Sequence, residues 1–143
     1  MMKQKETERL LDALKGDASL KDIMEEHEGT FLEGSVASEL AKIMEEKKIQ
    51  RRQLVKNSIL NEIYFYQILN GRKRPQRNKL ICVTLAMGLN LEETQRLLKV
   101  TGYPELYARL PQDCVIIYGI EHGLTPEGIN RLLFEQGLPL LDE

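Results

Sequence analysis

Residues 64–80 read YFYQILNGRKRPQRNKL, which is an aromatic and apolar run, an Asn-Gly pair and a basic loop around a proline. The run has the spacing of a helix, and Asn-Gly followed by proline is typical of a helix end and the loop behind it. A basic loop beside a helix is suited to hold nucleic acid, to cover an anionic membrane surface, or simply to face solvent. The charge and the helical pattern around this stretch distinguish among these three interpretations.

The positive charge belongs to a longer segment. Residues 47–79 contain ten basic residues and one acidic residue, whereas the rest of the chain contains ten basic and twenty-one acidic residues. The segment therefore carries +9 and the remainder −11, within a chain whose net charge is −2. Such polarity indicates that one part of the protein meets a polyanion. A solvated helix face explains the segment less well, because such faces usually mix charges of both signs.

Length and composition indicate one ordinary globular domain, with or without a small appendage. The chain has 143 residues, 42% hydrophobic and 29% charged, close to the averages for such domains. Its apolar runs are too short to cross a bilayer, so we expect no membrane partner. The first residues, MMKQKETERL, lack the apolar stretch of a signal peptide, and we expect a cytoplasmic location. Cys82 and Cys114 lie in apolar runs and are predicted to be small core residues.

Helix start and stop signals are dense and strand signals almost absent, so the predicted fold class is all-α, a helical bundle. Ser19 with Asp22 is a predicted capping box, Ser35 and Asn61 are predicted N-caps, and Gly29 is a predicted helix stop. The expected helices before the C-terminal region cover residues 7–15, 21–28, 36–44, 53–56, 62–69 and 77–87.

Residues 88–106 and 123–141 repeat one another. They read GLNLEETQRLLKVTGYPEL and GLTPEGINRLLFEQGLPLL, identical at nine of nineteen positions at an offset of 35. Each copy has a predicted N-cap, Asn90 or Thr125, and a terminating glycine with a proline two residues later. An apolar helical stretch precedes each copy. We therefore predict tandem helical hairpins that pack on the rest of the bundle, because two repeats are few for an independent solenoid.

From Ser38 to Glu93 the order is helix, Lys-rich turn, short helix, turn, helix, basic loop and two further helices. This span resembles the helix-turn-helix domain of the XRE or Cro-like phage-repressor family. The matching stretches are Leu40 to Lys47, RRQLV at 51–55, FYQI at 65–68 with Gly71 and Pro75, and LICVTLAMGLNLEE at 80–93. The resemblance implies a five-helix repressor-like core whose third helix reads DNA.

The third helix of that core supplies the candidate base contacts. If Leu60, Phe65, Ile68 and Leu69 form its buried stripe, the opposite face meets a major groove. On that face Gln67 is suited to adenine, Glu62 to a cytosine amino group and Ile63 to a thymine methyl. Asn61 is suited to a base edge or phosphate, and Tyr66 to stacking or phosphate. The alternative for each is an ordinary exposed side chain, and for Tyr64 a partly buried core ring is preferred.

Phosphate contacts are expected at two places. Arg51 and Arg52 begin the second helix of the motif, where backbone N–H groups and the positive end of the helix dipole also face an anion. The other candidates follow the recognition helix: Asn70, Arg72, Lys73, Arg74 and Arg77. If about five of these residues meet phosphate, the slope of log affinity against log salt is about −4 to −5.

These observations predict a sequence-specific DNA-binding transcriptional regulator, repressor-like, that binds double-stranded DNA as a homodimer. The predicted domains are an N-terminal helical extension (1–34), the helix-turn-helix domain (35–100) and a C-terminal hairpin (101–143) that repeats 78–106 and packs on the core. The acidic flanks are candidates for dimerisation or a protein partner. The alternative function is a helical protein-interaction adaptor, or an antitoxin-like regulator, that uses the C-terminal hairpins.

An enzyme is not expected. His27 and His122 have no nucleophile at a recognisable spacing, and two cysteines with two histidines make no zinc pattern. No Gly-rich phosphate loop follows a strand. We therefore predict no catalytic residue, no metal and no organic cofactor.

Overall fold

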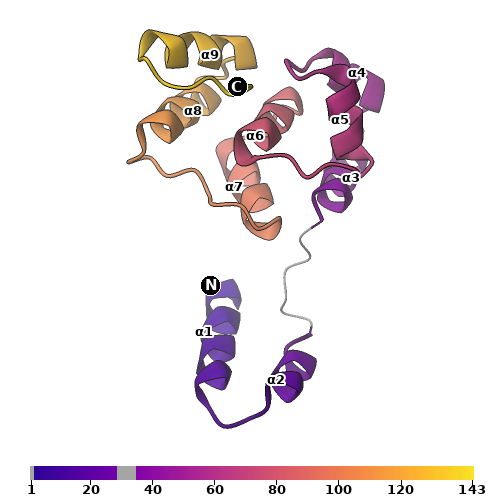
Figure 1. The fold of residues 1–143 in the computed structure, drawn as a ribbon, viewed down its shortest axis with the longest axis vertical. Coiled ribbons are helices and arrows are strands. Elements are labelled where there is room, and N and C mark those ends of the chain that lie inside the picture. The colour runs from indigo at the N-terminus through magenta and orange to yellow at the C-terminus, as the bar shows by residue number, and fades with distance from the viewer. Residues whose placement is uncertain (1, 29–34) are drawn as a thin grey trace. The chain divides into compact units, whose positions relative to one another are not determined.

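A computed structural model of the protein describes residues 2–28 and 35–143, and these form helices and connecting loops without a strand (Figure 1). The all-α fold class is confirmed. Within the described ranges none of the helices is both long and apolar enough to span a membrane. The helices are α1 (Met2–Lys15), α2 (Leu20–Glu26), α3 (Val36–Lys47), α4 (Arg51–Lys56), α5 (Glu62–Leu69), α6 (Arg77–Ala86), α7 (Leu91–Val100), α8 (Pro111–Glu121) and α9 (Pro126–Glu135).

The chain divides into two compact units, Met1–Glu33 and Gly34–Glu143. The first contains the hairpin of α1 and α2, in which Ser19 caps α2 by accepting a hydrogen bond from the Asp22 N–H at 3.1 Å. Ile23 is buried, whereas the large apolar side chains of this hairpin at Leu11, Leu14, Leu20 and Met24 are exposed. Helix α2 ends at Glu26, and the predicted stop at residue 29 lies outside the described residues.

In the second unit the predicted caps set the helix starts. The Ser35 hydroxyl accepts from the Ser38 N–H at 3.3 Å, and the Asn61 side chain accepts from the Tyr64 N–H at 3.1 Å. Each bond satisfies an N–H group that has no partner inside its own helix. Helices α3 and α5 therefore begin where the sequence places them.

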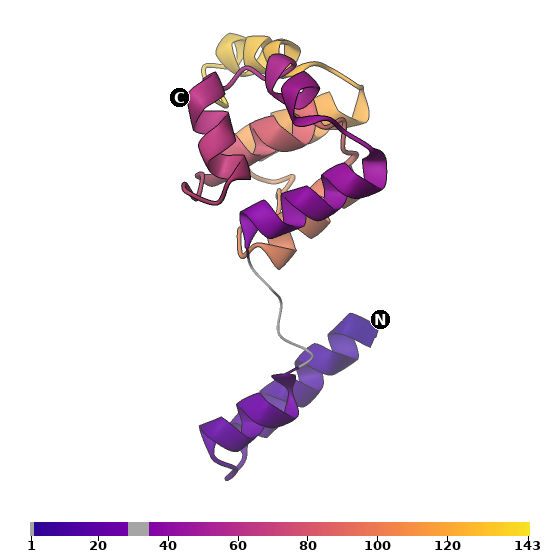
Figure 2. The same ribbon diagram turned by 90° about the vertical axis from the view of Figure 1, so that its right-hand side faces the viewer.

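One hydrophobic core joins α3 to α9 within this unit. In Figures 1 and 2, α4 and α5 lie at one side of the unit, α8 and α9 at the other, and α6 and α7 between them. The core contains residues from every one of these layers, among them Leu40, Leu54, Phe65, Leu80, Leu98 and Leu133, all at most 1% exposed. Residues 35–100 and 101–143, predicted as separate domains in contact, belong to this one compact unit.

The sequence repeat is also a structural repeat. Helices α6 and α7 correspond to α8 and α9 at the same offset of 35, with one residue of difference at the start of α8. The pairs Gly88/Gly123 and Gly102/Gly137 all have positive φ, between 65° and 85°, and end equivalent helices. In both copies the chain after the second helix is held by an amide side chain, because Gln95 accepts from the Leu106 N–H (2.7 Å) and Asn130 from the Leu141 N–H (2.8 Å).

The two hairpins contact each other through a reciprocal pair of side-chain interactions. Arg77 of α6 pairs with Asp113 of α8, while Asn78 of α6 donates to Gln112 of α8 at 3.3 Å. At the offset of 35, Arg77 is equivalent to Gln112 and Asn78 to Asp113. Such an exchange is characteristic of an isologous contact, here formed within one chain.

The core prediction holds for one cysteine and fails for the other. Cys82 is fully buried in α6, whereas Cys114 is exposed on α8. The prediction for Cys114 is wrong because one side of α8 faces solvent.

Candidate nucleic-acid interface

Helix α5 has the predicted two faces. Leu60, Phe65, Ile68 and Leu69 are all at most 8% exposed, so the predicted buried stripe is confirmed. On the other side Asn61, Glu62 and Ile63 are exposed, and Tyr66 and Gln67 are half-buried. All five base-contact candidates therefore retain accessible surface on one flank of the helix, and the Ile63 side chain is 70% exposed.

Two of these residues also stabilise the local structure, Asn61 through its side chain and Gln67 through its backbone. The Asn61 carbonyl oxygen caps α5, so its amide N–H₂ group is the part left to meet a ligand. Gln67 uses its backbone oxygen, which accepts from the N–H groups of Arg72 (2.9 Å) and Lys73 (3.2 Å). These bonds, together with the positive φ of Gly71 (77°), fold the basic loop back against the end of α5. The sequence motif Asn-Gly-Arg-Lys thus sets two cations beside Gln67.

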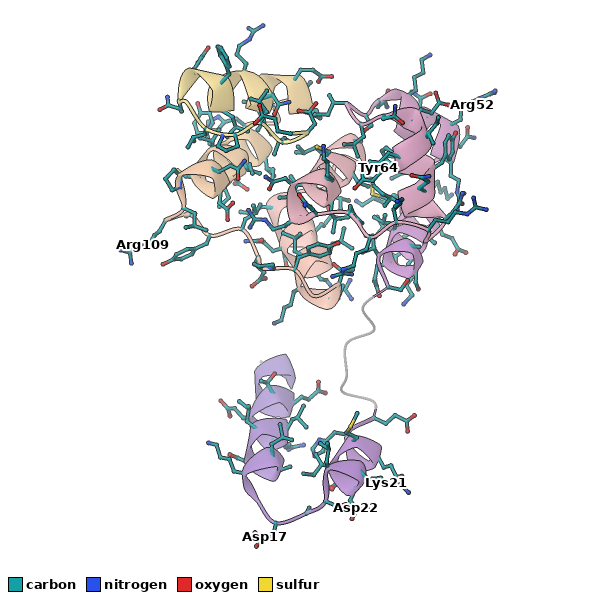
Figure 3. All side chains as sticks on the ribbon, in the orientation of Figure 1. Asp17, Lys21, Asp22, Arg52, Tyr64 and Arg109 are labelled. Atoms are coloured by element: carbon teal, nitrogen blue, oxygen red, sulfur yellow. The ribbon has the colours of Figure 1, made fainter. Side chains whose placement is uncertain are left out.

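Arg51 ties the start of α4 to the end of α5. Its guanidinium donates to the Asn70 side-chain oxygen at 2.8 Å, across nineteen residues of sequence. Because Asn70 directly precedes the loop that carries Arg72 and Lys73, this bond places Arg51 close to that loop. Both Arg51 and Asn70 are exposed. Arg52 is exposed on α4 and points away from α6 and α7 (Figure 3). Gln50, the N-cap residue of α4, makes no side-chain capping bond.

The last two phosphate candidates are held by the body of the unit. Arg74 is exposed, but its guanidinium donates to the Thr101 backbone oxygen at 2.7 Å and lies 4.4 Å from the centre of the Tyr103 ring. Arg77 binds Asp113 through both terminal nitrogens, and the Asp113 side chain is 1% exposed. Because both terminal nitrogens of Arg77 are bonded to Asp113 of α8, Arg77 is not among the cations of the candidate interface. The partner residue was not identified from the sequence, because Asp113 lies in the first turn of α8, where an acidic residue is common.

Ion pairing leaves most of the positive charge of residues 47–79 uncompensated. Two cations of this segment form ion pairs with carboxylates of the described residues. One is Arg77, and the other is Lys47, whose Nζ lies 2.8 Å from Glu93. The hydrogen bond from Lys47, followed by that from the Asn90 N–H, holds the pKa of Glu93 below its usual range. Glu93 and Asn90 also form a reciprocal capping box at the start of α7. Among the phosphate candidates, Arg51, Arg52, Arg72 and Lys73 therefore remain exposed around the start of α4 and the end of α5, outside the ion pairs of the described residues.

Tyr64 is half-buried and points into the unit between α5 and α6 (Figure 3), as predicted for a core ring. Burial raises the pKa of its hydroxyl. Burial also raises the pKa of the Cys82 thiol, to about 12. Both groups stay neutral at ordinary pH, so the core beneath α5 adds no charge to the interface.

Metal ligands do not gather in the described part of the chain: it contains no cluster of three or more His, Cys, Asp or Glu side chains that could hold an ion. Comparison of the chain with protein-family models, curated proteins and solved structures finds no match.

Proposed function

We propose that this protein is a sequence-specific DNA-binding transcriptional regulator of the helix-turn-helix type, repressor-like, that inserts α5 into the major groove. The observation that supports it is the position of the exposed flank of α5 beside exposed cations at one edge of the unit. Base edges would meet Glu62, Ile63 and Gln67. Phosphates would meet the four exposed cations, and Asn70 would orient Arg51 toward them.

The arrangement predicts a specific salt dependence. Four phosphate contacts give a slope of log affinity against log salt of about −3.6, shallower than the value expected for five or more. Replacing both Arg72 and Lys73 with alanine should reduce the slope to about −2 and weaken binding to every duplex. As a matched control, replacing Arg109 and Arg131, two exposed cations of the C-terminal hairpin, should leave the slope unchanged.

Selection of bound sequences from a random duplex pool, repeated at two salt concentrations, tests sequence specificity. Enrichment of a short inverted repeat, with half-sites about 34 Å apart, would support a two-fold dimer on DNA. Equal retention of all sequences, or an unchanged slope in the Arg72 and Lys73 variant, would refute the proposal. A Gln67→Ala variant should relax specificity at one base position, at a cost of about 1–3 kcal/mol on the preferred site.

A further inference from the structure

The C-terminal hairpin has an open apolar groove. It has a volume of about 480 Å³ and is lined by Pro111, Cys114, Val115 and Tyr118 of α8, by Leu132 of α9, and by Gln136 and Leu138, which follow α9. Tyr118 is 52% exposed, and Cys114 is also exposed. Tyr118 stacks on His122, with ring centres 4.0 Å apart, which orders this side of α8.

The same face of the first hairpin is covered by the chain itself. At the offset of 35, the groove positions Tyr118 and Leu132 correspond to Val83 and Leu97, which are 0% and 2% exposed. Gln136, which is exposed, corresponds to Thr101, which is 1% exposed. Equivalent positions are thus buried in the first copy and at least partly exposed in the second. Within residues 35–143, other parts of the chain pack on this face of the repeat in the first copy and leave it open in the second.

The cover on the first hairpin comes from the basic segment. Lys47 at the end of α3 pairs with Glu93 at the start of α7, at 2.8 Å. Arg74, in the loop after α5, donates to the backbone oxygen of Thr101, the equivalent of Gln136. Val83 and Leu97 share one hydrophobic core with the buried residues of α3, α4 and α5. At the edge of this core, the basic side chains of Lys47 and Arg74 bond to the first hairpin.

Two carboxylates lie beside the open groove. They belong to a segment, residues 101–143, with seven acidic and two basic residues, one of the seven being Asp113, which is buried and paired with Arg77. Glu121 follows Tyr118 by three residues and Glu135 follows Leu132 by three, which places a carboxylate one turn from each groove residue on the same side of its helix. Two copies of such a groove placed face to face would bring carboxylates together, so charge favours a basic occupant over a second copy of this chain.

We propose that the α8–α9 groove binds an amphipathic helix of a partner protein, with an apolar stripe flanked by lysine or arginine. The apolar stripe would lie on Tyr118 and Leu132, and the flanking cations would meet Glu121 and Glu135, as Lys47 meets Glu93 in the first hairpin. This site is separate from the DNA-binding face and does not depend on it.

The test uses the full chain without DNA and a labelled synthetic helix of about 18 residues, or five turns. The probe has leucine at i, i+3, i+4 and i+7 and lysine elsewhere, and a counterpart has glutamate in place of lysine. Fluorescence anisotropy should show binding of the lysine peptide at least about tenfold tighter than the glutamate peptide, because like charges at the rim repel. Equal affinities would overturn the proposal.

Two matched variants locate the site. Tyr118→Lys places a cation in the groove and should weaken the lysine peptide about tenfold, whereas Phe134→Lys, at a 77% exposed position outside the groove lining, should change affinity less than about twofold. Equal effects of the two variants would refute the site. The Arg72 and Lys73 double variant should bind the peptide normally, so failure here is distinguishable from failure of DNA binding.

Alkylation of Cys114 gives a second readout. Cys82 is buried and its thiol pKa is about 12, so modification near neutral pH reports on Cys114 alone. The lysine peptide should slow the reaction in proportion to the bound fraction. A reaction that slows with protein concentration alone would assign the groove to a second copy of the chain and overturn the proposal.

Discussion

Asp113 is the best position at which to test the packing of the two hairpins, because its carboxylate is buried and both of its oxygens accept hydrogen bonds. It accepts from both terminal nitrogens of Arg77 and, at 2.9 Å, from the Tyr107 N–H. Its side chain is 1% exposed, and that of Arg77 is 19% exposed. Replacing Asp113 with alanine would leave a largely buried guanidinium and a backbone N–H without their acceptor.

The size of the effect follows from this burial. Removing one partner of a buried ion pair costs about 3–5 kcal/mol, and the partial exposure of Arg77 to water favours the lower end, about 3 kcal/mol. For a unit of this size each kcal/mol lowers the melting temperature by about 4 °C, so Asp113→Ala should melt about 12 °C lower. Thermal unfolding followed by circular dichroism measures the shift.

Two further variants make the result interpretable. Asn78→Ala removes only the neighbouring 3.3 Å bond to Gln112 and should cost less than about 1 kcal/mol. Arg77→Met combined with Asp113→Leu replaces both charges and should recover most of the loss, with about 1 kcal/mol left for the unpaired Tyr107 N–H. A shift below about 3 °C for Asp113→Ala would show that the pair does not hold the hairpins together.

Two further predictions concern α7, α8 and α9. A Cβ at Gly119 would lie 2.3 Å from a side-chain carbon of Ile129, which is fully buried, so Gly119→Ala should destabilise the unit by about 1–3 kcal/mol. Gly128→Ala, where the nearest atom lies at 3.4 Å, should be neutral or stabilising; equal melting temperatures would contradict the close packing. Glu93→Gln retains the capping box but removes the ion pair with Lys47, at a cost of about 0.5 kcal/mol near pH 7. Because the folded pKa of Glu93 lies below its value in the unfolded chain, this contribution is present at neutral pH and should vanish as acid titrates the wild-type carboxylate, as urea titrations at pH 7 and pH 3 would show.

Local sequence patterns were sufficient to predict most of the helices and the repeat. Caps such as Ser35, Asn61 and Thr125 act through bonds to a residue three positions along the chain, so the signal and its structural effect lie in the same short window. The buried stripe of α5 was also predictable, because helical spacing alone decides which side chains share a face. For the same reason the exposed side of α5, which carries the candidate base contacts, was predictable from the sequence.

The distribution of the cations and the burial of one repeat face depend on how the helices pack, and local sequence patterns did not predict them. Arg72 and Arg77 lie five residues apart in one basic run, yet only Arg77 meets a carboxylate, and that residue is thirty-six positions away. Cys82 and Cys114 both lie in apolar runs, but they occupy different positions of the repeat, and Cys114 lies on the side of α8 that faces solvent. Local pattern specifies which side chains are suited to burial or to a charge partner. Whether a covering helix or a charge partner lies within contact distance depends on residues distant in sequence, because the packing of whole helices sets which of them come together.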